Sequence, residues 1–481
     1  MIFNIITKTD KKGLIIIDYM INQETGEIVT IKDLLEYTGI VYVSNLNKSF
    51  FEIIKELKRL KFKNVYAITK KNQFSFFYKN GECYSIKINN NGKFLTIANF
   101  EKKFVVDFGN YEKNKKLIEY AIAEERTSSS LGRDSFNEWL RTFFKVKKHT
   151  INVNACYTIF RRDYPIIKDS MLDTAKEFVT GYQYAQQGYY YNVHNYDICS
   201  SYPAQLLNDT PKGKPIEYKT LEEIPPTYFY VVKFTAIDIN VKPNKIDFLE
   251  TNNKNIATFV LTKQLFELFK NNYAFKMLKI KRITGFKTRK GVFAEFVEKN
   301  VLMGKELELD PSIKKYNKAI ANSIVGYFGK NPVRSETKLE NGTINYRVVD
   351  SDPIYLPIYL YVLGKAKSEF IQVLEKCAKY DIIYANTDGF LTQHPVDMKK
   401  LNFGRSSKIG FFKNKIGFAE IYIECVNGYS AITQDGEIDN TISGLRTLNP
   451  VSVEEYRNKT FAYVVHEITS QGLTEKIISL E

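Results

Sequence analysis

Apolar residues in the first 130 positions follow two spacings, one typical of strands and one typical of helices. The run Gly13–Asp18 predicts a strand. Over Ser49–Phe62 the apolar residues recur at helical intervals, which predicts a helix with one buried face. Asn-Gly pairs at 80–81 and 91–92 each separate two strand-like runs and predict hairpins. Residues 1–130 are therefore expected to form an α+β module.

The rest of the chain alternates strand-like runs with longer amphipathic segments. Residues 382–393, IIYANTDGFLTQ, predict a short hairpin, because the turn formers Asn386–Gly389 lie between two apolar runs. The same patterns predict a basic helix over Asp134–Lys147, a strand over Tyr228–Ile239, helices over Leu261–Asn271, Val292–Glu308, Ile313–Phe328 and Ile358–Tyr380, a hairpin at Asn341–Gly342, and a helix opened by a capping box at Ser452–Glu455.

Length and charge narrow the class of protein. A chain of 481 residues, 44% hydrophobic and 26% charged, is expected to fold into several soluble domains. The formal charge of +15 indicates a polyanionic partner, most simply nucleic acid, with a membrane surface as the alternative. No apolar run is long enough to span a bilayer and no signal peptide is recognisable, so a soluble, intracellular protein without a membrane partner is expected.

Cysteine and histidine usage argues against two kinds of site. The five cysteines and four histidines are scattered singly along the chain. Neither a disulfide framework nor a zinc-ligand spacing is present. Any bound metal ion is therefore expected to have oxygen ligands.

Residues 195–207, NYDICSSYPAQLL, are the first candidate for chemistry. Asp197 ends an aromatic strand, and Pro203 suits the first turn of a helix that Ser200 or Ser201 would cap. Backbone amides at such a turn suit a triphosphate. The alternative is a surface aspartate that precedes an ordinary helix cap.

Residues 313–331, IKKYNKAIANSIVGYFGKN, are the second candidate. Lys318 and Asn322 are one helical turn apart and share a face, and Gly326 lies one turn further along it. A glycine there would let a flat base pair approach the backbone, and Lys318 would reach a phosphate. The alternative is a solvated lysine and a C-terminal helix cap.

The third candidate is the turn of the hairpin 382–393. Asp388 would meet Asp197 if both end strands of one sheet, and two carboxylates there would hold two divalent cations about 4 Å apart. Such cations activate an attacking oxygen and stabilise a leaving pyrophosphate. An Asp-Gly pair is more often only a turn.

The order of these motifs is similar to that in a known family. D-x-x-S-x-Y-P, K-x-x-x-N-S-x-x-G and Y-x-x-T-D resemble motifs A, B and C of family B DNA polymerases, and the stretches DICSSYPAQ, AIANSIVGYFGKNP and IIYANTDG resemble its protein-primed branch of small phages and linear plasmids. The resemblance runs from about residue 130 to 460. It implies a DNA-directed DNA polymerase that takes primer-template DNA, deoxynucleoside triphosphates, two Mg²⁺ or Mn²⁺ ions and, in this branch, a terminal-protein primer.

The resemblance implies an α+β fold, a multi-subdomain right-hand polymerase with an N-terminal ribonuclease H-like exonuclease-type domain. Its two palm insertions imply processivity and strand displacement. The implied boundaries are 1–130 for an inactive exonuclease-like domain, 131–208 and 354–442 for the palm, 209–291 and 332–353 for the two palm insertions, 292–331 for the fingers, and 443–481 for the thumb.

Residue roles follow from the matching positions. Asp197 and Asp388 resemble the catalytic, metal-binding carboxylates, with the Ile198 carbonyl as a further ligand. Tyr202 is similar to the residue that stacks under the incoming sugar and rejects a 2′-hydroxyl. The other implied contacts are with the nucleotide through Ser200, Lys305, Lys318 and Asn322, and with DNA through Tyr184, Gly188, Gly326, Thr387 and Tyr429.

Several positions depart from the family pattern. Asn386 stands where motif C has its first aspartate, which removes a negative charge beside the metals. Weaker cation binding, better activity in Mn²⁺ than in Mg²⁺, and recovered affinity in Asn386→Asp are therefore expected. Val325 replaces an aromatic residue of motif B, and Tyr429 lacks the lysine of a Lys-x-Tyr element.

The N-terminal module lacks the carboxylates of the family's 3′–5′ exonuclease. Ser49 and Lys115 stand at the aspartate positions of its second and third motifs. No aspartate before residue 125 begins a D-x-E pair, and these aspartates are Asp10, Asp18, Asp33 and Asp107. A domain without nuclease activity is expected.

Two alternatives to a primed polymerase remain at this point. One is a primer-independent or template-relaxed polymerase. The other is a catalytically silent, DNA-binding relative, which the changes at Asn386 and Val325 would suit.

Overall fold

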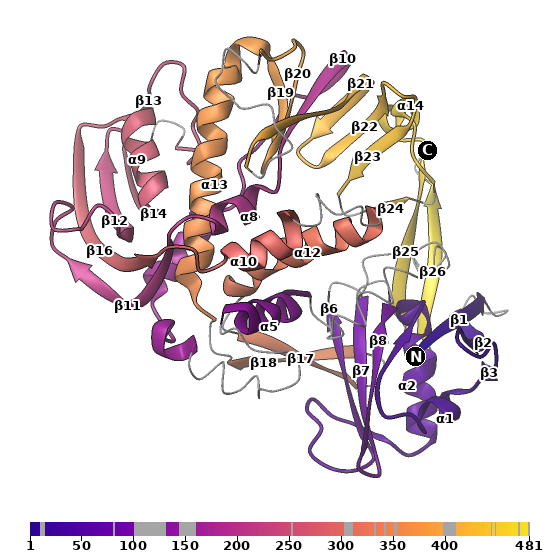
Figure 1. The fold of residues 1–481 in the computed structure, drawn as a ribbon. Helices are drawn as coiled ribbons and strands as arrows, with labels where there is room; N and C mark the ends of the chain where they lie inside the picture. Colours follow the sequence, from indigo (N-terminus) through magenta and orange to yellow (C-terminus); the bar gives the residue numbers. More distant parts are fainter. Residues whose placement is uncertain are drawn as a thin grey trace.

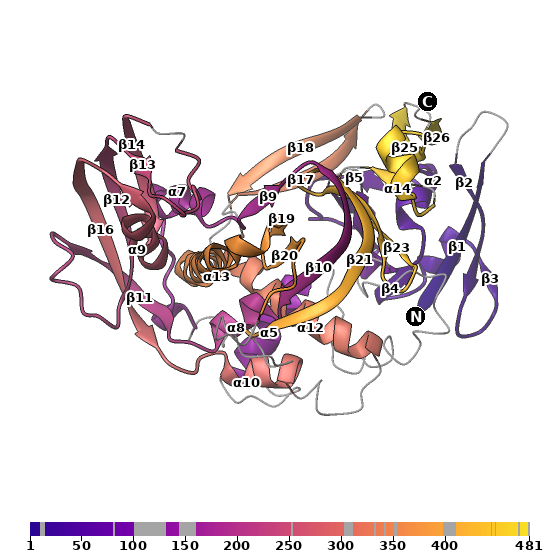
Figure 2. The ribbon, with the colours of Figure 1, turned by 90° about the horizontal axis from the view of Figure 1, so that it is seen from above.

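The computed structural model describes residues 1–9, 15–79, 82–100, 131–143, 160–251, 254–302, 311–330, 333–340, 343–350, 354–397, 410–443, 445–447, 449–469 and 472–479. A central sheet lies between an N-terminal module and an insertion of strands and helices (Figures 1 and 2). None of the described helices is long and apolar enough to cross a membrane.

The central sheet has seven strands in the order β23-β22-β21-β10-β20-β19-β9. The predicted hairpin 382–393 is confirmed as β19 and β20. β10 pairs with β20 on one side and with the long, curved β21 on the other (Figure 2). The bounds are β9 Gln183–Ala185, β10 Gly188–Ile198, β19 Ile382–Asn386, β20 Gly389–Thr392, β21 Phe412–Cys425, β22 Gly428–Thr433 and β23 Ile438–Ile442.

Helix α13 (Leu356–Cys377) runs between the central sheet and the insertion (Figure 2). Apolar residues lie all round it, as expected for a buried helix. Gly364 allows a close approach to the insertion, because a Cβ there would lie 2.3 Å from Thr262 Oγ1. The predicted helix Ile358–Tyr380 is thus confirmed, with its last residues forming a 3₁₀ turn, η3 (Ala378–Tyr380).

Helices α5 (Leu131–Phe143) and α12 (Pro311–Phe328) pack against each other beside the central sheet (Figure 1). Trp139 of α5 is fully buried, and its indole N–H donates to the Val292 carbonyl at 3.0 Å. Both helices were expected from the sequence. α5 begins earlier than predicted, and residues 144–147 lie outside the described residues.

The predicted helix Val292–Glu308 is confirmed only in part: helical structure spans residues 294–302, and residues 303–308 lie outside the described residues. The chain forms a short α10 (Ala294–Val297) and then a π-helical turn, η2 (Glu298–Leu302). Asn300 donates its side-chain amide to the Phe296 carbonyl at 3.0 Å, so a side chain competes for a helical backbone acceptor.

The segment after α8 (Ser201–Leu206) forms a four-stranded sheet in the order β11-β16-β12-β14, with α9 (Lys263–Asn272) packed against β12 and β14. β12 and α9 confirm the predicted strand and helix in this region. Glu375 of α13 ties the segment to the core through Lys245 at 2.7 Å and Asn272 at 2.5 Å. The strand bounds are β11 Thr210–Tyr218, β12 Phe229–Ile237, β14 Ile256–Thr262 and β16 Met277–Arg289, beside a small pair, β13 Asn240–Val241 and β15 Tyr273–Ala274.

The N-terminal module is built on a ten-stranded sheet in the order β18-β17-β6-β7-β8-β4-β1-β2-β3, with β5 beside β6. Two of these strands come from far along the chain, since β17 pairs with β6 at Thr337 and Phe76. Helix α2 (Leu46–Arg59) covers part of the sheet with its predicted apolar face. The bounds are β1 Ile2–Thr9, β2 Ile15–Asn22, β3 Ile28–Val29, α1 Ile31–Leu34, β4 Gly39–Val43, β5 Lys63–Asn64, β6 Gln73–Lys79, β7 Glu82–Asn90, β8 Lys93–Asn99, β17 Val333–Glu340 and β18 Thr343–Asp350.

Three hairpins predicted from Asn-Gly pairs have their strands in place. The turn at 91–92 is described, whereas the pairs at 80–81 and 341–342 lie outside the described residues. The C-terminal segment begins with α14 (Val453–Asn458), whose predicted capping box is confirmed. After α14 come strands β25 (Ala462–Thr469) and β26 (Gly472–Ser479). β25 pairs with β24 (Arg446–Thr447) on one side and with β26 on the other, and β26 contacts α2 and β2 (Figure 1).

Candidate active site

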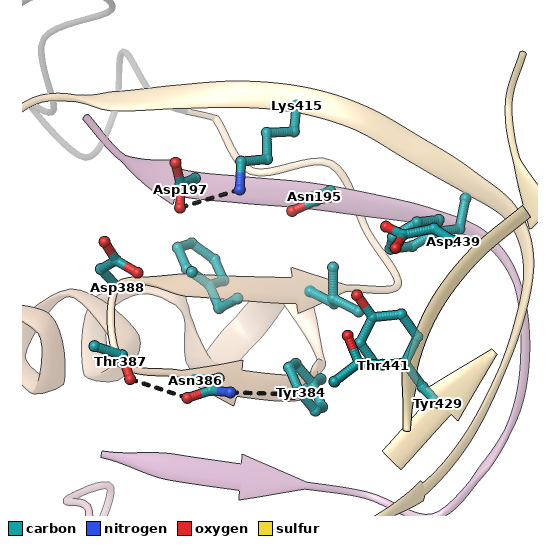
Figure 3. A pocket seen from close by; sticks show the side chains of 14 residues that line it. Asn195, Asp197, Tyr384, Asn386, Thr387, Asp388, Lys415, Tyr429, Asp439 and Thr441 are labelled. Atoms are coloured by element: carbon teal, nitrogen blue, oxygen red, sulfur yellow. Dashed lines mark hydrogen bonds and ion pairs between the residues drawn. The ribbon is translucent and has the colours of Figure 1, made fainter. Parts of the chain in front are cut away.

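Asp197 and Asp388 lie on neighbouring strands of the central sheet. Asp197 is near the end of β10, and Asp388 lies in the turn between β19 and β20. Asp197 is opposite Gly389 in the pairing of β10 with β20, and the Ile198 amide donates to the Asp388 carbonyl at 2.8 Å. Both carboxylates line one cavity of about 500 Å³, here called the first cavity (Figure 3). Sheet register thus brings together two acidic residues that are remote in the sequence.

Gly389 keeps space beside the first carboxylate. A Cβ at this position would lie 3.5 Å from Asp197 Oδ1 and 3.3 Å from the Tyr196 carbonyl oxygen. The second contact is tighter than ordinary van der Waals distance. A side chain at residue 389 would therefore crowd the strand that carries Asp197.

The two carboxylates have different surroundings. Burial and then the nearby charge of Asp197 raise the pKa of Asp388 to about 6, against the opposing effect of Lys415, Lys318 and Lys413. Asp197 is instead paired directly with lysines, since Lys413 Nζ lies 3.3 Å from its Oδ2 and Lys415 Nζ lies 3.2 Å from its Oδ1.

The donor set suits a hard divalent cation. Mg²⁺ commonly takes one or two protein carboxylates together with substrate phosphates and water. Asp197 and Asp388 supply two such carboxylates at the edge of one cavity. Among the described residues, no group of three or more His, Cys, Asp or Glu side chains is placed to hold a metal ion. The site therefore fits a cation that obtains its remaining ligands from substrate and solvent.

A second cavity of about 410 Å³ unites the three sequence motifs. Ser200 and Tyr202 of the first motif, Lys318 and Asn322 of the second, and Asp388 of the third line it. Thr387 and Asp388 line both cavities, so the two spaces meet at the hairpin turn. The remaining lining residues are Ser201, Val325, Gly326, Tyr359, Leu363 and Thr387.

Tyr202 lies on α8 (Ser201–Leu206) at the wall of the second cavity. Burial, then the charge of Asp388, raises the pKa of its phenol to about 12, so the ring is neutral at physiological pH. Facing residues Tyr359 and Leu363 come from α13 and were not anticipated from the sequence. The two residues are four positions apart and so share a face of α13, and this spacing is the one signal in the sequence that could have identified them as a pair.

The predicted capping role of Ser200 is wrong. Ser200 does occupy the N-cap position of α8, but its φ of 50° and ψ of 56° are left-handed, and its side chain makes no capping hydrogen bond. A capping serine needs an extended backbone to aim its hydroxyl at the first-turn amides. Ser200 lines the second cavity instead.

Gly326 leaves open space on α12, as predicted. A Cβ built there meets nothing within 4 Å, and the residue lines the second cavity next to Asn322 and Lys318. Because Lys318, Asn322 and Gly326 follow the helical repeat, they form one strip along the cavity wall.

Asn386 is held by hydrogen bonds beside the turn (Figure 3). Its Nδ2 donates to Asn427 Oδ1 at 2.6 Å and to Tyr384 Oη at 3.3 Å. Its Oδ1 accepts from Gln183 Nε2 at 3.3 Å and from Thr387 Oγ1 at 3.0 Å. Both ends of the amide are thus engaged with neighbouring side chains, and the gain in cation affinity expected from Asn386→Asp stays a prediction.

The candidate DNA contacts gather around the same hairpin. Tyr184 of β9 is opposite Ala385 in β19 and is partly exposed. Thr387 has a left-handed φ of 61°, and its amide donates to the Tyr182 carbonyl at 2.9 Å. Tyr429 lies in the first cavity with its ring edge-on to Tyr384, at a centroid distance of 5.7 Å.

Gly188 is the first residue of β10 and lies in a crowded position. A Cβ there would lie 2.8 Å from the Tyr190 hydroxyl oxygen. Lys305, the remaining candidate for nucleotide binding, lies outside the described residues, as do Asp10, Asp107 and Lys115.

The described part of the N-terminal module uses its acidic and hydroxyl residues structurally. Asp18 forms an ion pair with Lys8 at 2.6 Å, and Asp33 closes the capping box of α1 with Thr30. The Ser49 hydroxyl donates to the Asn45 carbonyl at 2.9 Å. None of these residues faces another carboxylate in a metal-binding group within the described ranges.

Comparison with known proteins gives a consistent result. Residues 111–388 match the family model described as DNA polymerase type B, organellar and viral. The DNA polymerases of Bacillus phage phi29 and Bacillus phage PZA are 26% and 25% identical over 270 residues, which is 48% of this chain and 46% of each relative. The match thus spans about half the length of these curated relatives.

Solved structures of phi29 DNA polymerase match the whole chain. The complex with primer-template DNA and incoming nucleotide superposes with a TM-score of 0.80 at 16% identity, covering 100% of both chains. The post-translocation binary complex with primer-template DNA gives 0.80 at 18% identity, with the same coverage. The predicted fold class, an α+β multi-subdomain polymerase fold, is confirmed by these similarities.

Proposed function

This chain belongs to the type B DNA polymerases of organelles and viruses, and from that premise we propose that it is a DNA-directed DNA polymerase. It extends a primer strand 5′ to 3′ on a DNA template. The primer 3′-hydroxyl attacks the α-phosphate of a deoxynucleoside triphosphate, and pyrophosphate leaves. The observation that carries the proposal is the second cavity, where side chains from all three motifs meet at Asp388.

The second cavity is the proposed nucleotide site. Lys318 provides a positive charge for the triphosphate, and Asn322 a polar group on the same helix face. Tyr202 provides a flat, neutral wall against the sugar, where a 2′-hydroxyl would be excluded. The open face at Gly326 leaves room for the nascent base pair.

Asp197 and Asp388 would hold two divalent cations, Mg²⁺ or Mn²⁺, which supply activation of the attacking hydroxyl and stabilisation of the leaving pyrophosphate. Ile198 follows Asp197 directly and would add its carbonyl oxygen. These side chains also orient the two substrates, because Asp388 lines both cavities and Asp197 lines the first cavity beside it.

The first cavity is the proposed seat of the primer end. Tyr429, Tyr384 and Thr387 line it, and Asp388 separates it from the nucleotide cavity. Tyr184 lies in β9, and Gly188 is the first residue of β10. The phi29 complexes contain primer-template DNA and incoming nucleotides, which supports the same partners here.

The proposed subdomains keep the boundaries expected from the sequence. The segment 209–291 contains the four-stranded insertion sheet, and 332–353 contains the β17–β18 hairpin. That hairpin extends the N-terminal sheet, an arrangement suited to enclosing template, and it supports proposed strand displacement. Protein priming and the loss of 3′–5′ proofreading are also proposed. The phage origin of the relatives supports action inside a host cell.

A catalytically silent DNA-binding protein is the second candidate. It is favoured by Lys413 and Lys415, which neutralise Asp197, and by Asn386 in place of a carboxylate. Its predicted behaviour differs in one respect: primer-template would bind but not be extended.

Primer extension separates these functions. The purified chain is given a labelled primer, with and without template, in Mg²⁺ and in Mn²⁺, and products are sized on a denaturing gel. Template-dependent extension supports the proposal. Extension without template indicates a template-relaxed polymerase, and binding without extension in both metals overturns the proposed activity in favour of the silent relative.

A further inference from the structure

Two lysines of β21 hold both oxygens of Asp197. Lys413 Nζ lies 3.3 Å from Oδ2 and Lys415 Nζ lies 3.2 Å from Oδ1. Strand register creates this contact, because Lys413 is directly opposite Asp197 and Lys415 is opposite Asn195. Residues at alternate positions share a face of the sheet, so both lysines project on the side of the carboxylate.

The exposure of the three side chains differs. Asp197 is only 11% exposed, whereas Lys413 and Lys415 are 36% and 46% exposed. The carboxylate is therefore fixed, and the ammonium groups reach it from solvent. Ion pairs with such exposed partners are weak, so the lysines can exchange Asp197 for another anion at little cost.

Three lysines lie near the carboxylates of Asp197 and Asp388, while a third carboxylate, Asp439, also lines the first cavity. Asp197 and Asp388 face Lys413 and Lys415 from β21 and Lys318 from α12. A divalent cation approaching the free protein therefore meets ammonium groups already at the oxygens it needs. A triphosphate or a primer phosphate instead meets a positive field and ammonium groups that can donate hydrogen bonds to its oxygens.

We propose that Lys413 and Lys415 are exchangeable counter-ions of Asp197, which they hold in the free protein and leave for substrate phosphates when nucleotide or primer binds. Asp197 would then be free to hold a divalent cation only once the nucleotide has bound. The identity of the phosphates rests on the proposed function. The competition between the two lysines and a divalent cation for Asp197 does not depend on it.

The competition is tested by Mn²⁺ binding to the free protein, without nucleotide or DNA, followed by electron paramagnetic resonance. Removing both ammonium groups in Lys413→Gln/Lys415→Gln should tighten Mn²⁺ binding at least about tenfold, because two like charges no longer oppose the ion. Asp197→Asn added to this variant should abolish the gain. An affinity equal to that of the wild type would overturn the inference.

A matched control comes from the insertion. Lys270 pairs with Glu267 at 2.7 Å, with similar exposure, on α9 away from the two cavities. Lys270→Gln should leave Mn²⁺ affinity unchanged, and a tenfold gain there as well would show a general charge effect and overturn the specific role. Thermal melting of all variants confirms that they are folded.

The transfer to phosphate has its own readout. In primer extension the double variant should raise the KM for deoxynucleotide several-fold, since the lysines no longer bind phosphate, and an unchanged KM would overturn the transfer. If the wild type fails to extend any primer but the Mn²⁺ result holds, the proposed polymerase function fails and the counter-ion role at Asp197 stands.

Discussion

At the scale of single residues, the Asn386 side chain is held by hydrogen bonds at both of its polar atoms. Its amide joins Gln183, Thr387 and Asn427 at the hairpin turn. Two departures noted separately in the sequence, Asn386 and the missing lysine before Tyr429, therefore meet in one hydrogen bond.

Asn386→Asp is expected to destabilise the protein. The new carboxylate oxygen would face Asn427 Oδ1, which is 2.6 Å from the present donor, so two acceptors would oppose each other. A loss of about 1–3 kcal/mol is expected in urea unfolding, as for a part-buried group left unpaired. The second change Asn427→Lys should recover most of that loss in a double-mutant cycle. An Asn386→Asp single variant as stable as the wild type would contradict this account of the turn.

Tyr202 is expected to decide the sugar that is incorporated. Tyr202→Val removes the wall facing the second cavity, so incorporation of ribonucleotides relative to deoxynucleotides should rise by about 100-fold. Tyr202→Phe keeps the ring and serves as the matched control, with little change in the ratio. Both ratios come from kcat/KM for the two kinds of triphosphate. Equal discrimination in Tyr202→Val would remove Tyr202 from the proposed sugar contact.

At the scale of elements, the sequence predicted what local pattern controls. The hairpin at Asp388, the long helix α13 and the capping box of α14 follow from apolar spacing and turn chemistry. The predicted capping hydrogen bond of Ser200 was wrong because the residue has a left-handed backbone. A serine placed before a helix does not reveal that conformation in the sequence. The segment Val292–Glu308 was predicted as one regular α-helix, whereas α10 passes into the π-helical η2, where the Asn300 side chain donates to a backbone carbonyl.

Features that depend on pairing between distant elements could not be predicted. Lys413 and Lys415 reach Asp197 only through the register of β10 with β21. Tyr359 faces the second cavity because of the way α13 packs, and β17 joins the N-terminal sheet across most of the chain. The motifs were enough to locate the site in the sequence. The lysines that balance the charge of Asp197 could be found only from the packing of distant strands.

Lys367 of α13 is expected to make the free energy of unfolding depend on pH. The residue is buried, donates to the Phe178 carbonyl of α7 (Ser170–Phe178) at 2.9 Å, and has its pKa lowered by burial to about 8. Between pH 8 and about 10.5 the unfolded chain binds this proton and the folded chain does not, so stability rises with pH there. Below pH 8 that contribution is absent.

The pH effect is isolated by comparison with Lys367→Met. Urea unfolding of both proteins from pH 7 to 10 should show the wild type gaining about 2–3 kcal/mol relative to the variant. The difference removes the titration of other groups. A constant difference over this range would mean that Lys367 keeps its ordinary pKa when folded.

At the scale of the whole molecule, three parts of the chain enclose the central sheet. The N-terminal module is extended by β17 and β18 and is reached by the C-terminal strand β26 (Figure 1). The insertion lies on the opposite side, fastened to α13 (Figure 2). With a formal charge of +15, this arrangement suits a polyanion held by several parts at once.

Binding of primer-template should therefore depend strongly on salt. The dissociation constant, measured by fluorescence anisotropy without divalent metal, should rise by at least about 100-fold between 50 and 200 mM NaCl, as expected when several phosphates are neutralised by lysine and arginine. An uncharged peptide nucleic acid duplex of the same sequence is the control. A salt-independent affinity for DNA would exclude electrostatic binding as the main contribution.

The central claim, that Asp197 and Asp388 act together on a bound nucleotide, is tested most directly by single-turnover incorporation of one deoxynucleotide into a primer-template. Asp388→Asn should lower the rate by at least about 1000-fold, near 4 kcal/mol in the barrier, and Asp197→Asn similarly. Asp381→Asn, an exposed aspartate just before the same hairpin, should keep the wild-type rate. Incorporation by Asp388→Asn at the rate of Asp381→Asn would contradict the account.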